Sequence, residues 1–298
     1  MGALSAMNDS FRFFQKRFSD LVIPAAEGYL IMMCVSLVLT PLIIAMMFPA
    51  LILAVSTDTS AIVFMVVMIL LIYIVSIGAS AFGIGIMYGG MVKAIDDTRN
   101  HRKVKFGDMF RYGWKNKWEF FGIQLLNYFL YLLLTMGIVG FAVVIGILVI
   151  FYDEILGIIT LIMMMFGTSL LLYTFIPLQY LPFVIRHKKG TRGIVNVAEA
   201  WKEFFSDFFG YGGIGFLYML LIILLMFIPG INMIVSLAMH PAFISTLLIY
   251  YDEKYKIPVM PEPPSFPLYA PYPPYVPSYH PPGYPPPPYA SPVDRPDR

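Results

Sequence analysis

The feature that most constrains the fold is the alternation of long apolar segments with short basic ones. Six segments are long and almost free of charge: 29–55, 61–92, 120–152, 155–185, 208–228 and 231–251. A helix of about 20 apolar residues crosses the hydrocarbon core of a bilayer. Hydrophobic residues make up 59% and charged residues 13% of the chain, against ~45–50% and ~25% in soluble domains. A soluble globular protein is therefore excluded.

All 20 Lys and Arg residues lie on one side of these segments. They occur before the first segment, between the second and third, between the fourth and fifth, and after the sixth. The intervening turns 56–60, 152–154 and 229–232 contain none. Because basic residues are retained on the cytoplasmic side of a membrane, we predict a multi-pass protein of the cell membrane with cytoplasmic N- and C-termini. The predicted fold class is an all-α integral membrane protein with six transmembrane helices, arranged as three helical hairpins.

Three regions are expected along the chain: a cytoplasmic N-terminal segment 1–20, a six-helix transmembrane domain 21–256 and a tail 257–298. An acidic residue in an aromatic context recurs as Asp20, Glu119 and Asp207, with spacings of 99 and 88 residues. This spacing predicts three copies of one unit, in which a cytoplasmic helix is followed by an outward span, a tight turn and a return span. The alternative is that aromatic-rich membrane entries resemble one another, and that these acids only favour the helix dipole.

Two of the cytoplasmic linkers are predicted to be helical. Apolar residues recur at helical spacing within 106–118 and 194–208, with polar residues between them. The two linkers hold all three tryptophans, Trp114, Trp118 and Trp201, which we interpret as anchors of interfacial helices in the headgroup layer. The alternative is recognition of anionic lipid by the neighbouring basic cluster 99–105.

Few polar residues occur inside the apolar segments. His240 lies near the middle of the sixth segment and directly precedes Pro241, whereas Gln124, Asn127 and Gln179 lie nearer the cytoplasmic ends. An ionisable group at such depth is costly and is a functional candidate, so His240, Gln124, Asn127 and Gln179 form a candidate intramembrane polar site. The alternative for His240 is a neutral imidazole bonded to a backbone carbonyl that Pro241 leaves free.

A stripe of small residues marks the second apolar segment. Ala81, Gly85 and Gly89 are four residues apart and would lie on one face of a helix. Small residues at this spacing let another helix approach closely, so we predict a helix-packing face.

No catalytic, cofactor-binding or metal site is predicted. The four histidines are scattered, and the one cysteine, Cys34, excludes disulfide frameworks and cysteine-based zinc sites. An enzyme needs an acid, a base or metal ligands in one place. Glu27 is expected to reach water at the cytoplasmic edge of the first span. We therefore expect no enzyme, and no nucleic acid as a partner.

The tail differs sharply in composition from the rest of the chain. Residues 258–298 contain 17 of the 24 prolines and six tyrosines, which predicts disorder with a polyproline II bias. Tyr284 and Tyr289 complete Pro-Pro-x-Tyr patterns of the kind that WW domains bind. With Tyr275, they are candidate docking residues for a protein partner, and the alternative is a simple spacer.

The linkers resemble those of a known family. The stretches 89–96, 104–114, 182–201 and 250–253 are similar to the cytoplasmic parts of an uncharacterised six-span prokaryotic membrane protein family. This family includes YciC-like proteins and the membrane domain attached to some glycerophosphodiester phosphodiesterases. The resemblance covers about residues 15–256 and implies a six-span fold and a prokaryotic source. It implies no phosphodiesterase activity, because the catalytic domain is absent from this sequence.

Two functional hypotheses follow from these observations. The first is a non-enzymatic membrane scaffold or accessory protein whose tail docks partners. The second is a transporter or channel for a small or lipid-like solute. In both hypotheses the lipid bilayer is a partner, and both are compatible with a homo-oligomer.

Overall fold

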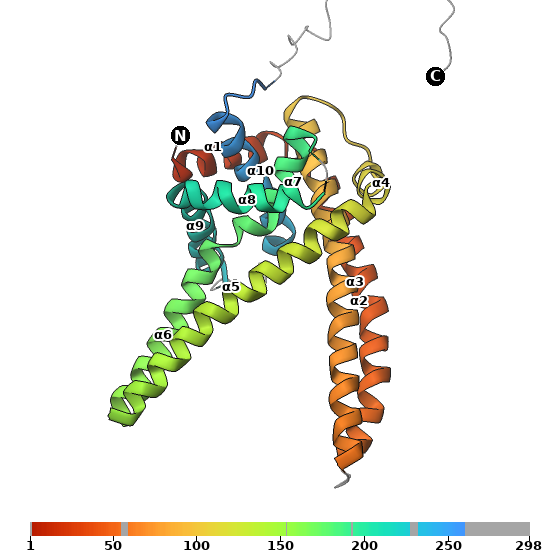
Figure 1. Cartoon of the computed structure of the whole chain (residues 1–298). Coiled ribbons are helices and arrows are strands. Elements are labelled where there is room, and N and C mark those ends of the chain that lie inside the picture. The colour runs from red at the N-terminus through yellow and green to blue at the C-terminus, as the bar shows by residue number, and fades with distance from the viewer. Residues whose placement is uncertain (1, 55–58, 153, 192, 227–231, 260–298) are drawn as a thin grey trace, which may run out of the picture. The chain divides into compact units, whose positions relative to one another are not determined.

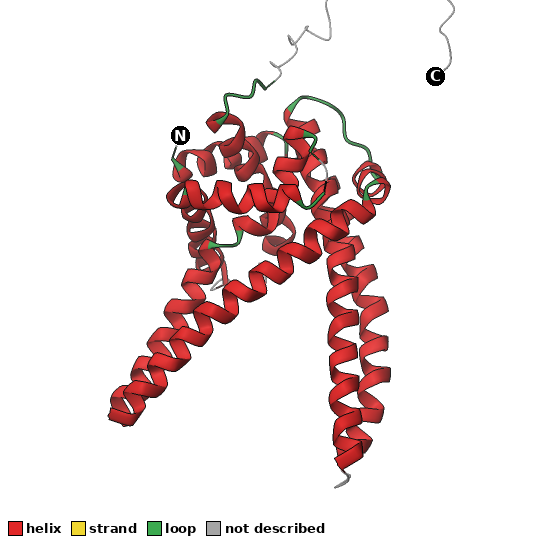
Figure 2. Cartoon of the chain, in the orientation of Figure 1, coloured by secondary structure: helices red, strands yellow, loops and turns green. Residues whose placement is uncertain are grey.

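The computed structural model describes residues 2–54, 59–152, 154–191, 193–226 and 232–259. Within these ranges the chain forms ten helices and no strand (Figures 1 and 2). The helices are α1 (Ala3–Lys16), α2 (Phe18–Ala54), α3 (Thr59–Arg99), α4 (Asp108–Lys115), α5 (Lys117–Tyr152), α6 (Glu154–Thr174), α7 (Pro177–Lys189), α8 (Val195–Ser206), α9 (Phe208–Met226) and α10 (Asn232–Lys254). The prediction of an all-helical chain is confirmed for this part.

Four of these helices are long and apolar enough to cross a membrane. The qualifying stretches, in α2, α3, α5 and α9, are Phe18–Pro41, Val63–Arg99, Lys117–Val149 and Phe208–Leu225. Large apolar side chains stay exposed along the parts of α3 and α5 farthest from the basic linkers, among them Phe64, Ile74, Phe141 and Phe151. Such continuous apolar surface is unfavourable in water and is covered in a bilayer. The structure therefore fits a helical membrane protein.

Consecutive long helices pack in pairs. α2 contacts α3, α5 contacts α6, and α9 contacts α10 (Figure 1). The buried core lies where the shorter helices α1, α4, α7 and α8 pack against the long ones, and it includes Phe120, Leu181, Phe204, Tyr211 and Leu248. We call this region, the four short helices with the residues packed against them, the head.

The N-terminal segment is itself part of the head. Its first residues form α1, which contacts α9 and α10. Ser10 is fully buried, and its hydroxyl donates to the carbonyl oxygen of Ala242 at 3.0 Å. The predicted segment 1–20 thus begins with a helix that packs into the head, and its partners, about 200 residues further along the chain, are not visible in the local sequence pattern.

Glu27 fixes the start of α4. Its carboxylate accepts the backbone N–H groups of Gly107 at 2.5 Å and Phe110 at 3.2 Å. These groups belong to the first turn of the helix, where N–H donors lack partners and a negative charge is favourable. Gly107 has φ +92°, a left-handed conformation that glycine adopts without strain. Glu27 is only 3% exposed, so the expectation that it reaches water is wrong: α4 covers it.

The apolar segment 155–185 is divided into two helices. α6 ends at Thr174 and α7 begins at Pro177, whose ring nitrogen cannot donate a helical hydrogen bond. The last turn of α7 carries Arg186, His187, Lys188 and Lys189. The break thus separates an apolar helix from a short one that delivers four basic side chains to the head.

Candidate functional site

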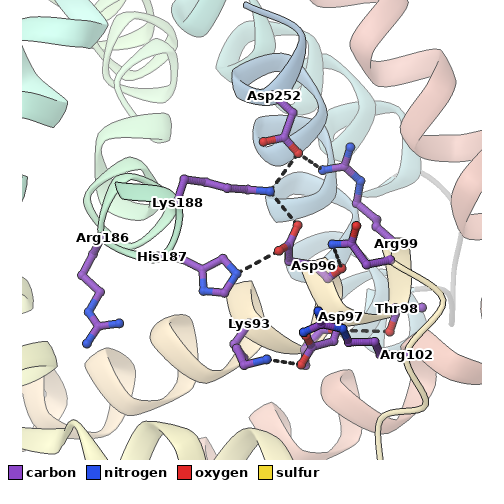
Figure 3. A network of polar contacts seen from close by, with 12 residues as sticks. Lys93, Asp96, Asp97, Thr98, Arg99, Arg102, Arg186, His187, Lys188 and Asp252 are labelled. Carbon is purple, nitrogen blue, oxygen red and sulfur yellow. Dashed lines mark hydrogen bonds and ion pairs between the residues drawn. The ribbon is translucent and has the colours of Figure 1, made fainter. Parts of the chain in front are cut away.

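The most extensive polar feature of the head is a largely buried ion-pair network that joins α3, α7 and α10 (Figure 3). Asp96 accepts from Lys188 Nζ at 2.7 Å and lies 2.9 Å from His187 Nε2. Asp252 accepts from the same Nζ at 2.9 Å and from Arg99 at 2.6 Å. Lys188 therefore bridges two carboxylates that come from different helices.

Burial makes this network important for the packing of the three helices. The exposed fraction of the Lys188 side chain is 10% and that of the Asp252 side chain is 3%. Buried ions are costly unless they are paired, and removal of one partner from a buried pair is strongly destabilising. One oxygen of Asp252, Oδ1, has no hydrogen-bond partner among the described residues. The network therefore fixes the ends of α3, α7 and α10 against one another.

A second cluster connects α5 with α7 through Arg186. Its guanidinium contacts Glu119 Oε2 at 3.0 Å and Tyr112 Oη at 2.8 Å. Glu119 also accepts the backbone N–H of Gly193 at 3.2 Å. The acid at the start of α5 is thus bound both by α7 and by the loop that follows it.

A third cluster connects α8, α9 and α10 through Lys254. Its ammonium group lies 2.7 Å from Glu203 and 3.0 Å from Asp207. Tyr250 donates to Asp207 at 2.7 Å and Tyr255 donates to Glu203 at 2.6 Å. Burial alone would raise the pKa of both carboxyl groups, but the hydrogen bonds and the charge of Lys254 lower the pKa of each below its usual value.

The three clusters give the recurring acids of the sequence different partners. Glu119 pairs with Arg186 of α7, the helix that follows the α5–α6 pair. Asp207 pairs with Lys254 of α10, the second helix of the α9–α10 pair. Asp20 instead pairs locally with Arg17 at 3.6 Å. The recurring acids were predicted from the sequence, but their bases and the whole Asp96–Lys188–Asp252 network were not. The relevant signal was an acid or base at the end of each apolar segment.

The residues of the candidate intramembrane polar site have separate surroundings among the described residues. His240 Nδ1 lies 2.7 Å from the hydroxyl of Tyr180 rather than at a carbonyl. Asn127 donates to the carbonyl of Leu178 at 2.9 Å. The side chain of Gln124 is fully buried, and neither of its amide atoms has a partner among the described residues. No described hydrogen bond joins any two members of this set.

Gln179, the fourth of these residues, faces a pocket between α3 and α5. The pocket has a volume of about 690 Å³ and is lined mostly by apolar side chains, including Ile77, Leu125 and Leu132. This volume lies within the ~300–1,000 Å³ of typical small-molecule sites. The pocket can accept an apolar molecule next to one amide group.

The small-residue stripe lies at the closest approach of α3 to α5. A Cβ on Gly85 would be 2.7 Å from the carbonyl oxygen of Phe120, and one on Gly89 would be 2.3 Å from the ring of the same residue. Ala81 is fully buried. The backbone of α5 could not come as near to larger side chains at these positions.

The three tryptophans have different surroundings. Trp114 and Trp118 expose 46% and 69% of their surface and both contact the ring of Phe82. Trp201 is half-buried, and its indole N–H donates to Asn127 Oδ1 at 3.4 Å. Trp114 and Trp118 are thus free to contact lipid, whereas Trp201 joins α8 to α5.

The predicted docking site of the tail lies outside the described residues. This applies to nearly all of the tail, including Tyr275, Tyr284 and Tyr289. Within the described ranges, no group of three or more His, Cys, Asp or Glu side chains is placed to hold a metal ion.

The all-helical fold, with four helices long and apolar enough to cross a membrane and an ion-paired head, fits the class of helical membrane proteins. Comparisons with protein-family models, with curated proteins and with solved structures find no match to this chain. The six-span family resemblance therefore stays a prediction.

Proposed function

We propose that this chain is a multi-pass protein of the cell membrane that acts as a non-enzymatic scaffold or accessory protein and docks partners through its tail. In this proposal six spans form three hairpins, both termini are cytoplasmic, and the source is prokaryotic. The complete segregation of Lys and Arg supports the orientation.

The observation that carries the proposal is the use of charged side chains in the head. Asp96, Glu119, Asp207 and Asp252 each bind a cation from another helix. Charges used in this way hold helices together, as a rigid support requires. Lys254 fixes the end of α10 only a few residues before the proline-rich region begins, so the tail starts from a fixed point.

Deletion of residues 258–298, followed by crosslinking and pulldown from native membranes, tests the docking role. We expect partners captured by the full chain to be lost from the truncated one. A full-length variant with Tyr275, Tyr284 and Tyr289 replaced by Ala separates tyrosine recognition from tail length. An unchanged partner list in the truncated chain would refute the docking role.

The second candidate function is transport of a small or lipid-like solute, and the pocket between α3 and α5 favours it. Cysteines introduced one at a time along α3 and α5, in a Cys34→Ala background, report which positions react with a water-soluble thiol reagent. A continuous reactive face would support a pathway for solute. Protection of every position in both helices would rule out a water-filled pore.

A further inference from the structure

A second apolar pocket lies beneath the interfacial helix α4. It has a volume of about 470 Å³ and is walled by α2, α3, α4 and the residues just before α4. Among the lining residues are Leu30, Cys34, Phe82, Phe106, Phe110 and Trp114. The carboxylate of Glu27 also borders it, but its oxygens are bound to the backbone of α4. The pocket therefore offers an apolar chain a nearly uninterrupted apolar wall.

The wall formed by α4 is rigidly placed, yet its aromatic side chains are exposed. On one face of α4, Met109 is buried, and a Cβ on Gly113 would lie 2.5 Å from the carbonyl oxygen of Ile86. On another face, Phe110 and Trp114 are 44% and 46% exposed, and Phe106, which precedes the helix, is 67% exposed. Large exposed apolar side chains in a continuous row mark a surface that a partner covers.

Charge around the same helix indicates what that partner carries. The segment 103–117 contains five cations, Lys103, Lys105, Arg111, Lys115 and Lys117, and one carboxylate, Asp108. Arg111 and Lys115 are exposed, and neither is in an ion pair within the described part of the chain. Lys117 Nζ lies 4.1 Å from the centroid of the Trp114 ring, at the wall of the pocket. The apolar pocket is therefore accompanied by a cationic helix.

We propose that this pocket binds one acyl chain of an anionic phospholipid, whose headgroup is held by the cations of α4. The combination of an apolar cavity with an excess of positive charge matches a molecule with an apolar chain and a negative headgroup. This inference rests on the proposed function in one respect, because lipid can reach the pocket only when the chain is inserted in a bilayer. It adds a selective lipid site to ordinary membrane anchoring.

Quenching of Trp114 by brominated acyl chains tests the site. The full chain with Trp118 and Trp201 replaced by Phe is placed in phosphatidylcholine nanodiscs that contain equal fractions of either brominated phosphatidylglycerol or brominated phosphatidylcholine. We expect stronger quenching by the anionic lipid. Arg111→Gln with Lys115→Gln should weaken this preference by roughly fivefold per cation removed. Arg12→Gln with Lys202→Gln, two exposed cations on α1 and α8, is the matched control and should retain it.

A pocket-filling variant tests the acyl-chain part separately. Cys34→Phe points a larger side chain into the open space and should reduce quenching of Trp114 by both lipids. A chain that retains only Trp201, on α8, should be quenched equally by the two lipids. Equal quenching of Trp114 by both lipids, or an unchanged preference in the Arg111 and Lys115 variant, would overturn the site.

Two further outcomes separate the proposals. Absence of quenching at Trp114 and at the exposed Trp118 alike, in single-tryptophan chains, would contradict membrane insertion itself and with it the proposed function. Quenching of Trp114 that appears only after deletion of residues 258–298 would show that the tail occupies the pocket, and would overturn the lipid assignment while leaving the membrane class intact.

Discussion

Replacement of Lys188 by Met removes the cation that bridges Asp96 and Asp252. The carboxylate of Asp252 is buried and that of Asp96 is 13% exposed. Among the described residues each keeps one other side-chain partner, His187 for Asp96 and Arg99 for Asp252. Loss of one member of a buried ion pair costs about 3–5 kcal/mol. Because each carboxylate keeps a second partner, we expect the free energy of unfolding to fall by an amount at the lower end of this range, ~3 kcal/mol. At ~2–4 °C per kcal/mol for a chain of this size, we expect the melting temperature to fall by roughly 6–12 °C.

Tryptophan fluorescence during heating in detergent micelles measures this change. The neighbouring Lys189→Met is the matched control, because its pair with Glu199 at 3.0 Å is exposed and worth at most ~1 kcal/mol. Asp96→Asn added to Lys188→Met should recover part of the loss, since it removes an uncompensated negative charge. Equal shifts for Lys188→Met and Lys189→Met would refute the view that the network holds the head together.

Three other changes test separate features of the head. Gly85→Ala should lower stability by about 1–3 kcal/mol, because its Cβ meets a backbone carbonyl of α5. Gly78→Ala on the same helix, with open space around it, should be neutral or stabilising by up to ~1 kcal/mol; equal melting shifts for the two would contradict the packing. Lys254→Met should be less stable than the native chain at pH 7. This difference in stability should shrink as the pH falls below about 4, because the carboxyl groups of Glu203 and Asp207, whose pKa values are lowered, stabilise the fold only while they are ionised. A series of melting curves from pH 7 to 3 measures the difference, and a constant difference would refute the prediction. Glu27→Gln should cost about 1.5–3 kcal/mol and should speed amide exchange in the peptide 106–115, whereas unchanged exchange would show that Glu27 does not fix α4.

Features that depend on local pattern were predictable from the sequence. The helices α4 and α8 follow from apolar residues at helical spacing. The apolar segments in α2, α3, α5 and α9 follow from their length and composition. Each of these is set by residues that are close together in the chain.

Features that depend on long-range contacts were not predictable. The partners of Asp96 are 91 and 92 residues away, and no spacing rule selects Lys188 over the other basic residues of the linkers. Glu27 is buried because α4 covers it. The sequence of the first apolar segment does not show where α4 lies. The pocket under α4 likewise requires three helices at once, whereas the sequence shows only a basic, aromatic linker.

The network around Lys188 also constrains the order in which the protein can be completed. Its members occur at positions 96–99, 187–188 and 252, so the ribosome makes Asp96 long before the cations that bind it and makes Asp252 last. Until then Lys188 lacks one of its carboxylates, and α1 lacks α10, with which it packs. Because burial of an unpaired charge is costly, the ends of α3 and α7 cannot take up their final burial before α10 has been made. Closure of the head is therefore a late step that requires α10, and a chain that ends before residue 252 leaves Arg99 without its carboxylate partner.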